Sequence, residues 1–235
     1  MDSLLENWQA VRARIQAACQ RCGRDPASVH LLAVSKTFAA DAVRTVGQAG
    51  QRDFGENYIQ EAVDKITALR GDASPLPLAW HCIGPIQSNK TRLVAEHFDW
   101  AHTVDRLKIA QRLNEQRPAA MPPLNVCIQV NTDGGATKSG VAPDAVLALA
   151  RAIAALPRLR LRGLMTIPDP VAGFEAQVQL HRQAKGLFDT VRADAASPDF
   201  DTLSMGMTAD LEAAIHAGST MVRVGTAIFG RRAPV

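Results

Sequence analysis

Apolar residues follow two alternating patterns along this chain. Residues 2–22 place apolar side chains three and four positions apart, which predicts an amphipathic helix. Downstream, short continuous apolar runs alternate with helical patterns, and such runs are typical of parallel strands covered on both faces. The predicted strands cover residues 30–35, 53–55, 78–83, 100–104, 124–130, 161–167, 202–205 and 221–224.

Helical patterns fill the intervals between these strands. With the helix at 2–22 they make eight helices for eight strands, which predicts a single-domain (β/α)8 TIM barrel over residues 1–235, with an extra N-terminal helix. A doubly wound open sheet also alternates strands and helices, but it usually has fewer strands. The predicted helices after the first cover residues 40–49, 56–69, 88–96, 106–116, 143–155, 173–194 and 209–217.

Composition narrows the class of protein further. The chain has 235 residues, 47% of them hydrophobic, and a net charge of +3, which is ordinary for a globular domain. Basic residues do not gather as they do in nucleic-acid binders, and no stretch approaches the ~18 apolar residues of a membrane span. The N-terminus lacks signal-peptide features, and four cysteines are too few for a disulfide framework in a chain this long. We therefore expect a cytoplasmic protein without nucleic-acid or membrane partners.

The first candidate functional residue is Lys36, which lies just after the apolar run 31–34. Barrel enzymes carry their sites at the carboxyl ends of the strands, so polar residues at these ends are candidates. Desolvation at such a place favours the neutral amine, which is the nucleophile of Schiff-base chemistry. A surface lysine or a partner in an ion pair fits the position equally well.

Two Gly-containing segments follow the seventh and eighth predicted strands. They are Ser204-x-Gly206-x-Thr208 and Gly225-Thr226, at the places where barrels frequently bind phosphate. Glycine lets backbone N–H groups approach an anion, and a helix beginning at Thr208 would direct its positive end toward it. Ser, Gly and Thr are also common in turns and helix caps, so ordinary turn chemistry is the alternative.

Arg223 lies inside the apolar run 221–224, and a buried arginine needs a partner or a ligand. A guanidinium only donates hydrogen bonds, so a pyridine nitrogen facing it would stay unprotonated. The histidines show no metal-ligand spacing, and no metal site is predicted. Tyr58 is the only tyrosine, so a mechanism that needs a second tyrosine base is not available.

Seven spaced motifs together resemble the pyridoxal phosphate homeostasis proteins, whose fold is like the barrel domain of alanine racemase. The resemblance runs in order through nearly the whole chain and implies a fold-type III barrel that binds pyridoxal 5′-phosphate (PLP). The motifs are 32–37 (LAVSKT), 54–58 (FGENY), 81–90 (HCIGPIQSNK), 130–131 with 137–140 (VN, TKSG), 163–168 (GLMTIP), 203–207 (LSMGM), and 222–226 with 228–230 (VRVGT, IFG).

The same resemblance implies a role for individual residues, none of them catalytic. Lys36 would hold PLP as a Schiff base, and Arg223 would face the pyridine nitrogen. Thr208 stands where the family usually has serine, which keeps a hydroxyl group there. The remaining cofactor-binding residues would be Asn57 beside the cofactor, Met165 in the pocket wall, and Ser204, Gly206, Gly225 and Thr226 on the phosphate.

The resemblance implies a protein that carries or buffers PLP and maintains vitamin B6 homeostasis without robust catalytic turnover. PLP-dependent apo-enzymes would be its partners, Lys138 a candidate competitor for the cofactor during transfer, and the monomer its expected state. A weak racemase-like enzyme is one alternative. A barrel that binds another phosphorylated metabolite, with Lys36 as a charge partner, is the other.

Overall fold

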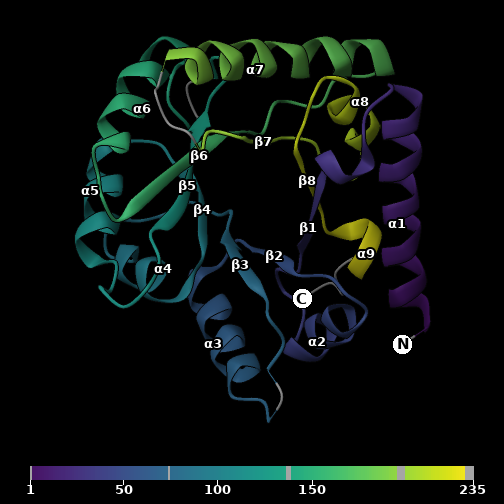
Figure 1. Ribbon diagram of the computed structural model, residues 1–235. Coiled ribbons are helices and arrows are strands. Elements are labelled where there is room, and N and C mark those ends of the chain that lie inside the picture. The colour runs from purple at the N-terminus through teal and green to yellow at the C-terminus, as the bar shows by residue number, and fades with distance from the viewer. Residues whose placement is uncertain (1, 74, 136–138, 195–198, 231–235) are drawn as a thin grey trace.

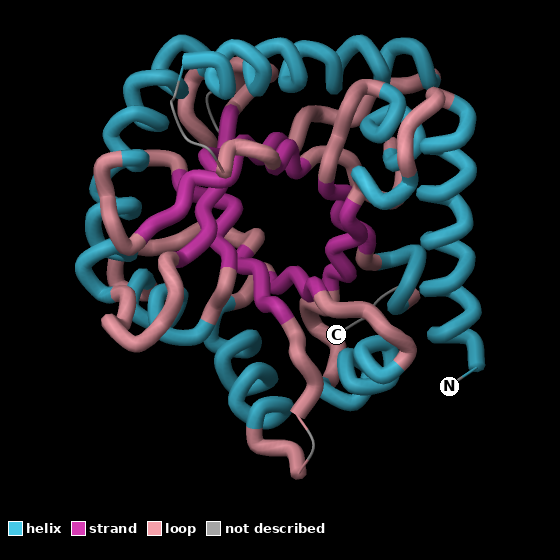
Figure 2. Tube along the Cα trace, viewed as in Figure 1, coloured by secondary structure: helices cyan, strands magenta, loops and turns pink. Residues whose placement is uncertain are grey.

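The computed structural model describes residues 2–73, 75–135, 139–194 and 199–230. Within them, eight parallel strands form a closed barrel in chain order, and β1 pairs with β8 to close it (Figures 1 and 2). This confirms the TIM-barrel prediction over the open sheet. The strands are β1 (His30–Val34), β2 (Asp53–Glu56), β3 (Ala79–Cys82), β4 (Trp100–Val104), β5 (Leu124–Val130), β6 (Leu159–Thr166), β7 (Thr202–Ser204) and β8 (Met221–Val224).

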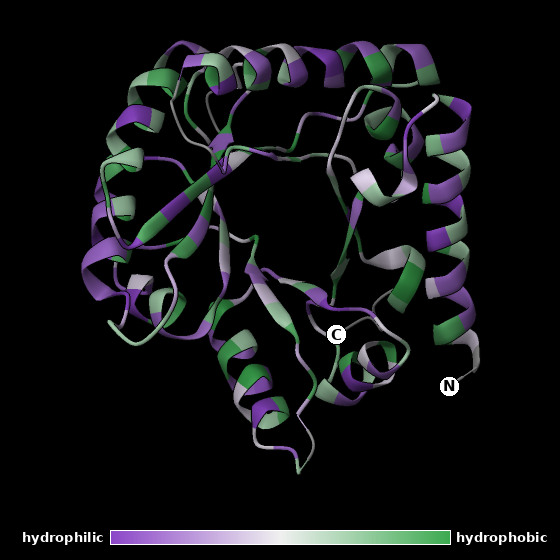
Figure 3. Cartoon of the chain, viewed as in Figure 1, coloured by the Kyte–Doolittle hydropathy of each residue, from purple (hydrophilic) through white to green (hydrophobic). Residues whose placement is uncertain are grey.

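A helix follows each strand, and one further helix precedes the barrel. These helices surround the barrel (Figure 2), and residues of opposite hydropathy alternate along them (Figure 3), as expected where one face packs on the strands. They are α1 (Asp2–Arg21), α2 (Ala40–Gln48), α3 (Ile59–Arg70), α4 (Thr91–His97), α5 (Leu107–Gln116), α6 (Val146–Ala154), α7 (Phe174–Asp194), α8 (Leu211–His216) and α9 (Thr226–Phe229); η1 (Pro26–Ser28) and η2 (Pro143–Ala145) are 3-10 turns.

Helices α3, α4 and α6 each begin three residues later than predicted, and two further differences concern the loops after β7 and β8. The helix after β8 is α9, which is too short to show a helical period, so the pattern missed it; α1 is therefore the extra helix. Helix α8 begins at Leu211, not at Thr208, because Asp210 accepts a hydrogen bond from the backbone N–H of Met207 at 2.6 Å and holds residues 207–210 in a turn.

Helix α1 covers the seam where the barrel closes. It lies beside α8 and α9 and contacts α2 (Figure 1). Trp8, Val11 and Ile15 are buried on its inner face, and the Trp8 Nε1–H donates to Gln51 Oε1 at 3.0 Å. No helix among the described residues is long and apolar enough to cross a membrane.

The barrel interior is partly polar. His102 on β4 contacts Ser204 on β7, and since these strands are not neighbours the contact crosses the interior. Apolar side chains fill the rest of this space, among them the buried cluster of Trp100, Cys127 and Met165. The polar contacts matter because they end at Arg223, beside the candidate site.

Candidate functional site

A cavity of about 430 Å³ lies at the carboxyl ends of the barrel strands, within the range of about 300–1,000 Å³ usual for small-molecule sites. Five of the predicted cofactor residues line it: Lys36, Asn57, Arg223, Gly225 and Thr226. The other lining residues are Val34, Phe38, Ile83, Ile167, Met207, Thr208, Ala209 and Gly230.

Lys36 follows β1 and is held through its two neighbours. Ser35 Oγ donates to Glu56 Oε1 at 2.6 Å, and the backbone N–H of Thr37 donates to Glu61 Oε1 at 2.7 Å. Thr37 adopts a left-handed φ of 69°, a conformation that a threonine keeps only where its surroundings hold it. The backbone on both sides of Lys36 is therefore anchored to β2 and α3.

Lys65 on α3 completes this support. Its Nζ donates to Glu56 Oε1 at 2.6 Å and to the carbonyl oxygen of Ser35 at 3.0 Å. Burial raises the pKa of Glu56, and Lys65 and Ser35 oppose that shift. Such a pair costs desolvation energy, but it specifies one geometry for the end of β1.

Arg223 enters the cavity from β8 and is almost fully buried. Its Nη1 donates to Ser204 Oγ at 2.8 Å and its Nη2 donates to the carbonyl oxygen of Thr166 at 2.8 Å. Burial lowers the pKa of Arg223 to about 10, with Asp210 and Cys127 opposing the shift. The guanidinium therefore stays positively charged at neutral pH and is fixed in orientation.

Asn57 follows β2 and offers the cavity an acceptor. Its Oδ1 is buried and has no hydrogen-bond partner in the described part of the chain. Gly84 fixes the backbone of Asn57, since a Cβ on Gly84 would lie 2.0 Å from the Asn57 carbonyl oxygen. Buried acceptors are rarely left unsatisfied in proteins, so this oxygen points to a ligand that donates.

The loops after β7 and β8 form another part of the cavity lining. Gly225 lies against β1, where a Cβ would approach the Val34 carbonyl oxygen to 3.0 Å, and Thr226 follows it into the cavity. Thr208 contributes a second hydroxyl residue to the lining. Asp210 holds the Thr208 loop through Met207 and through His181 Nε2 at 2.9 Å.

Three predicted cofactor residues lie behind the lining. Ser204 is fully buried and contacts His102 and Arg223, and Met165 is fully buried in the barrel interior. Gly206 packs against α8, where a Cβ would lie 2.4 Å from Ala214 Cβ. Their direct contact with a cofactor stays a prediction. Lys138 lies outside the described residues.

Sequence reasoning did not assign several lining residues to the site. Phe38 lies two positions after Lys36, and its ring packs against the ring of Phe229 of α9, with the ring centres 5.1 Å apart. Ile83 and Ile167 directly follow the last residues of β3 and β6 in the carboxyl-end loops. Only their position at the end of a strand could have indicated that these residues line the site, because an apolar side chain has no reactive or charged group.

The family model for the alanine racemase N-terminal domain matches residues 7–233. A curated relative from Pseudomonas aeruginosa, named pyridoxal phosphate homeostasis protein, is 58% identical over 99% of this chain and 97% of its own length. The chain belongs to the pyridoxal phosphate homeostasis protein family. The Escherichia coli family member of the same name is 55% identical over 99% of this chain and 98% of its own.

Solved structures agree with membership of the pyridoxal phosphate homeostasis protein family. PipY of Synechococcus elongatus was solved with PLP bound and is 36% identical to this chain, with a TM-score of 0.79. The match covers 93% of this chain and 100% of the PipY chain. An alanine racemase of Clostridium difficile shares the fold alone, at 14% identity and a TM-score of 0.75. This family member covers 58% of that racemase chain.

Proposed function

We propose that this protein binds pyridoxal 5′-phosphate covalently through Lys36 and carries or buffers it, without robust catalytic turnover. The observation that carries this proposal is the convergence of Lys36, Asn57 and Arg223 on one cavity at the carboxyl ends of the strands. Relatives that share more than half of its sequence are named for pyridoxal phosphate homeostasis, and PipY was solved with PLP bound.

The residues present fit the chemistry of this cofactor. Lys36 supplies a primary amine for an aldehyde, and Thr208, Gly225 and Thr226 supply hydroxyl and backbone groups for a phosphate. The unpartnered Asn57 Oδ1 accepts from a ring hydroxyl. Val34, Ile83 and Met207 provide apolar walls for a flat ring. The group and the cavity match in size and in polarity.

The covalent step is reversible, which suits a carrier. Lys36 Nζ adds to the aldehyde carbon, a carbon–nitrogen double bond forms, and one water molecule leaves. Hydrolysis reverses this balance and returns the lysine amine. The anchored backbone of Ser35 and Thr37 keeps Lys36 in place through both directions.

Arg223 supports binding over turnover. When bound, PLP supplies an electron sink whose strength depends on the group at its ring nitrogen. A guanidinium donates and cannot accept, so a ring nitrogen facing Arg223 stays unprotonated and the sink is weak. Tyr58, the only tyrosine of the chain, is half exposed, and it is not among the residues that line the cavity.

A spectroscopic titration tests the proposal. The protein mixed with PLP should develop a visible absorption band, and borohydride followed by peptide mapping should place the reduced cofactor on Lys36. Lys36→Ala should abolish both, while Lys108→Ala, which removes an exposed lysine of α5, should retain both. A label on another lysine, or no band at any PLP concentration, would overturn the site. Alanine racemisation at an ordinary enzymatic rate would overturn the absence of turnover.

We further propose that PLP-dependent apo-enzymes receive the cofactor from a monomeric carrier. Hydrolysis of the Lys36 bond releases the aldehyde, and a lysine of the receiving apo-enzyme that captures it prevents its return to Lys36. Mixing the loaded protein with an apo-enzyme should activate that enzyme even when a scavenger removes free PLP. Activation that the scavenger abolishes would contradict direct transfer, and sedimentation of a dimer would contradict the monomer.

A further inference from the structure

A line of hydrogen-bonded side chains crosses the barrel interior and ends at Arg223. Arg223 Nη1 lies 2.8 Å from Ser204 Oγ, and Ser204 Oγ lies 3.0 Å from His102 Nδ1. His102 Nε2 lies 2.9 Å from His81 Nδ1, and His81 Nε2 lies 3.0 Å from Asp53 Oδ1. We call these five residues the interior chain.

The protonation of the interior chain follows from Ser204. Its Oγ accepts from Arg223, which has only donors. Within the described residues, the one acceptor left for the Ser204 hydroxyl hydrogen is His102 Nδ1. His102 therefore accepts at Nδ1 and carries its proton on Nε2.

The remaining hydrogen bonds of the interior chain determine the tautomer of His81. His102 Nε2–H donates to His81 Nδ1, so His81 carries its proton on Nε2 as well. That proton is donated to the carboxylate of Asp53. Both imidazoles are then neutral, and every bond of the interior chain points from the Arg223 cation toward the Asp53 anion.

Burial favours a neutral His102. His81, His102 and Ser204 are fully buried, and this burial lowers the pKa of His102 well below its usual value. Burial opposes ionisation of Asp53, but the opposing interactions, led by the hydrogen bond from His81, outweigh it and lower its pKa. The charged end groups are thus Arg223 and Asp53.

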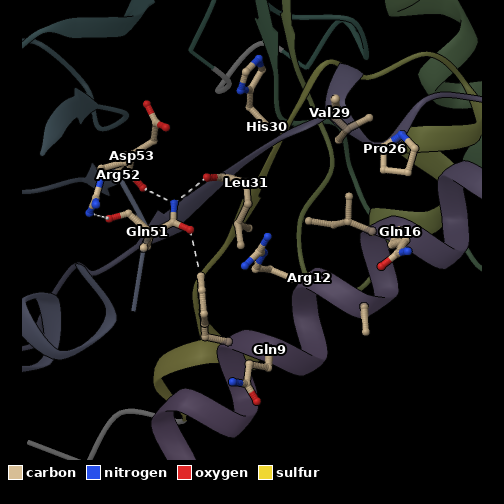
Figure 4. Close-up of a pocket in the computed structure, with 15 residues that line it drawn as sticks. Gln9, Arg12, Gln16, Pro26, Val29, His30, Leu31, Gln51, Arg52 and Asp53 are labelled. Atoms are coloured by element: carbon tan, nitrogen blue, oxygen red, sulfur yellow. Dashed lines mark hydrogen bonds between the residues drawn. The ribbon is translucent and has the colours of Figure 1, made fainter. Parts of the chain in front are cut away.

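The two ends open on opposite faces of the barrel. Arg223 lines the cavity at the carboxyl ends of the strands. Asp53, at the start of β2, lines a hollow of about 580 Å³ between α1 and the starts of β1 and β2 (Figure 4). It also lines a second hollow, of about 290 Å³. Asp201, paired with Arg162 at 2.7 Å, lines that second hollow without joining the interior chain.

We propose that Ser204, His102 and His81 are positioning residues that orient Arg223 and link it to the carboxylate of Asp53 on the opposite face. This gives Ser204 a role other than phosphate binding. This inference rests on the proposed function in one respect, namely that Arg223 faces the ring of the bound cofactor. The tautomers of the interior chain are independent of any cofactor.

The tautomers can be tested in cofactor-free protein. In a long-range proton–nitrogen spectrum at neutral pH, His81 and His102 should each carry one proton, on Nε2, and His102 should keep this state down to about pH 5.5, where ordinary histidines are protonated. Assignment by single His81→Gln and His102→Gln variants keeps the readout specific. An Nδ1–H tautomer at His102, or an imidazolium at either residue, would overturn the assignment whether or not the protein binds PLP.

The positioning role is tested at Ser204. Ser204→Ala should move the visible band of bound PLP and change the His102 nitrogen shifts, and Ser204→Thr, which keeps the hydroxyl, should restore both. Thr91→Ala removes another fully buried hydroxyl, at the start of α4 and outside the interior chain, and should change neither. If Ser204→Ala instead weakens the binding of PLP more than the binding of pyridoxal and leaves the His102 nitrogen shifts unchanged, Ser204 is a phosphate ligand and the proposal fails.

The far end is tested by removing one charge. Asp53→Asn keeps an acceptor for His81 but removes the anion, so the pH midpoint of the visible band should fall by a few tenths of a unit. Asp201→Asn removes a charge from a hollow that Asp53 also lines, and should leave the midpoint in place. Asp210 and Cys127 beside Arg223, and His30 beside Asp53, are unchanged in both variants. Equal shifts in the two variants would show a general field effect and contradict the link.

Discussion

Lys65 and Glu56 form a buried ion pair, 2.6 Å apart, directly behind the backbone that carries Lys36. Both side chains are almost completely shielded from solvent, and Ser35 joins them through its hydroxyl and its carbonyl oxygen. The position of Lys36 therefore depends on a second lysine, which is not among the residues that line the cavity.

Lys65→Met should destabilise the protein by about 3–5 kcal/mol, because it leaves the Glu56 carboxylate buried without its partner. Burial already raises the pKa of Glu56, so the loss should be smallest in acid, where Glu56 is protonated, and should grow as the pH rises through that pKa. Urea unfolding at several pH values measures this. The double variant Glu56→Gln/Lys65→Met should recover part of the loss. Lys185→Met, which breaks an exposed pair, should cost under about 1 kcal/mol.

Gly84→Ala should lower stability by about 1–3 kcal/mol or more and weaken PLP binding, because the new Cβ would displace the Asn57 carbonyl oxygen. Gly186→Ala is the matched control, since nothing lies within 4 Å of a Cβ there and the residue is inside α7. Alanine should stabilise that helix by up to about 1 kcal/mol. Thermal unfolding and PLP titration of both variants would refute this account if the two behaved alike.

Asp210 should make the Thr208 loop sensitive to acid. Burial opposes its ionisation, but the hydrogen bonds from His181 and from the Met207 backbone outweigh it and lower the pKa of Asp210 below 3.8. Its stabilisation is thus complete above the unfolded value and is lost as the pH falls through the lower folded value. Asp210→Asn should cost about 1–3 kcal/mol at neutral pH and progressively less in acid. A cost that stays constant with pH would contradict this origin; Asp189→Asn is the surface control.

Thr208→Ala should weaken the binding of pyridoxal 5′-phosphate about tenfold while changing the binding of pyridoxal little, because the hydroxyl is expected to serve the phosphate. Thr190→Ala on α7 removes a hydroxyl that bonds only within its own helix, and should leave both affinities unchanged. Equal losses for the two ligands would place Thr208 on the ring rather than on the phosphate.

Much of the architecture follows from local sequence patterns and was predictable from them. Apolar runs predicted β4, β5 and β8 to the residue, because each strand is buried on both faces and bounded by polar residues, proline or glycine. Lys36 and Arg223 were candidates for a related reason, because a charged residue beside or inside such a run needs a partner or a ligand, and both line the cavity. Helix α9 was not, since its four residues are too few for a period.

The sequence by itself determined the order of strands and helices, and it brought polar residues to the strand ends. Only the tertiary structure decided which of two neighbouring hydroxyl residues, Ser204 or Thr208, lines the cavity. Ser204 faces His102, 102 positions away, because closure of the barrel brings β4 opposite β7 across the interior. Local periodicity carries no information about such a contact, since it depends on how the strands close and in which register.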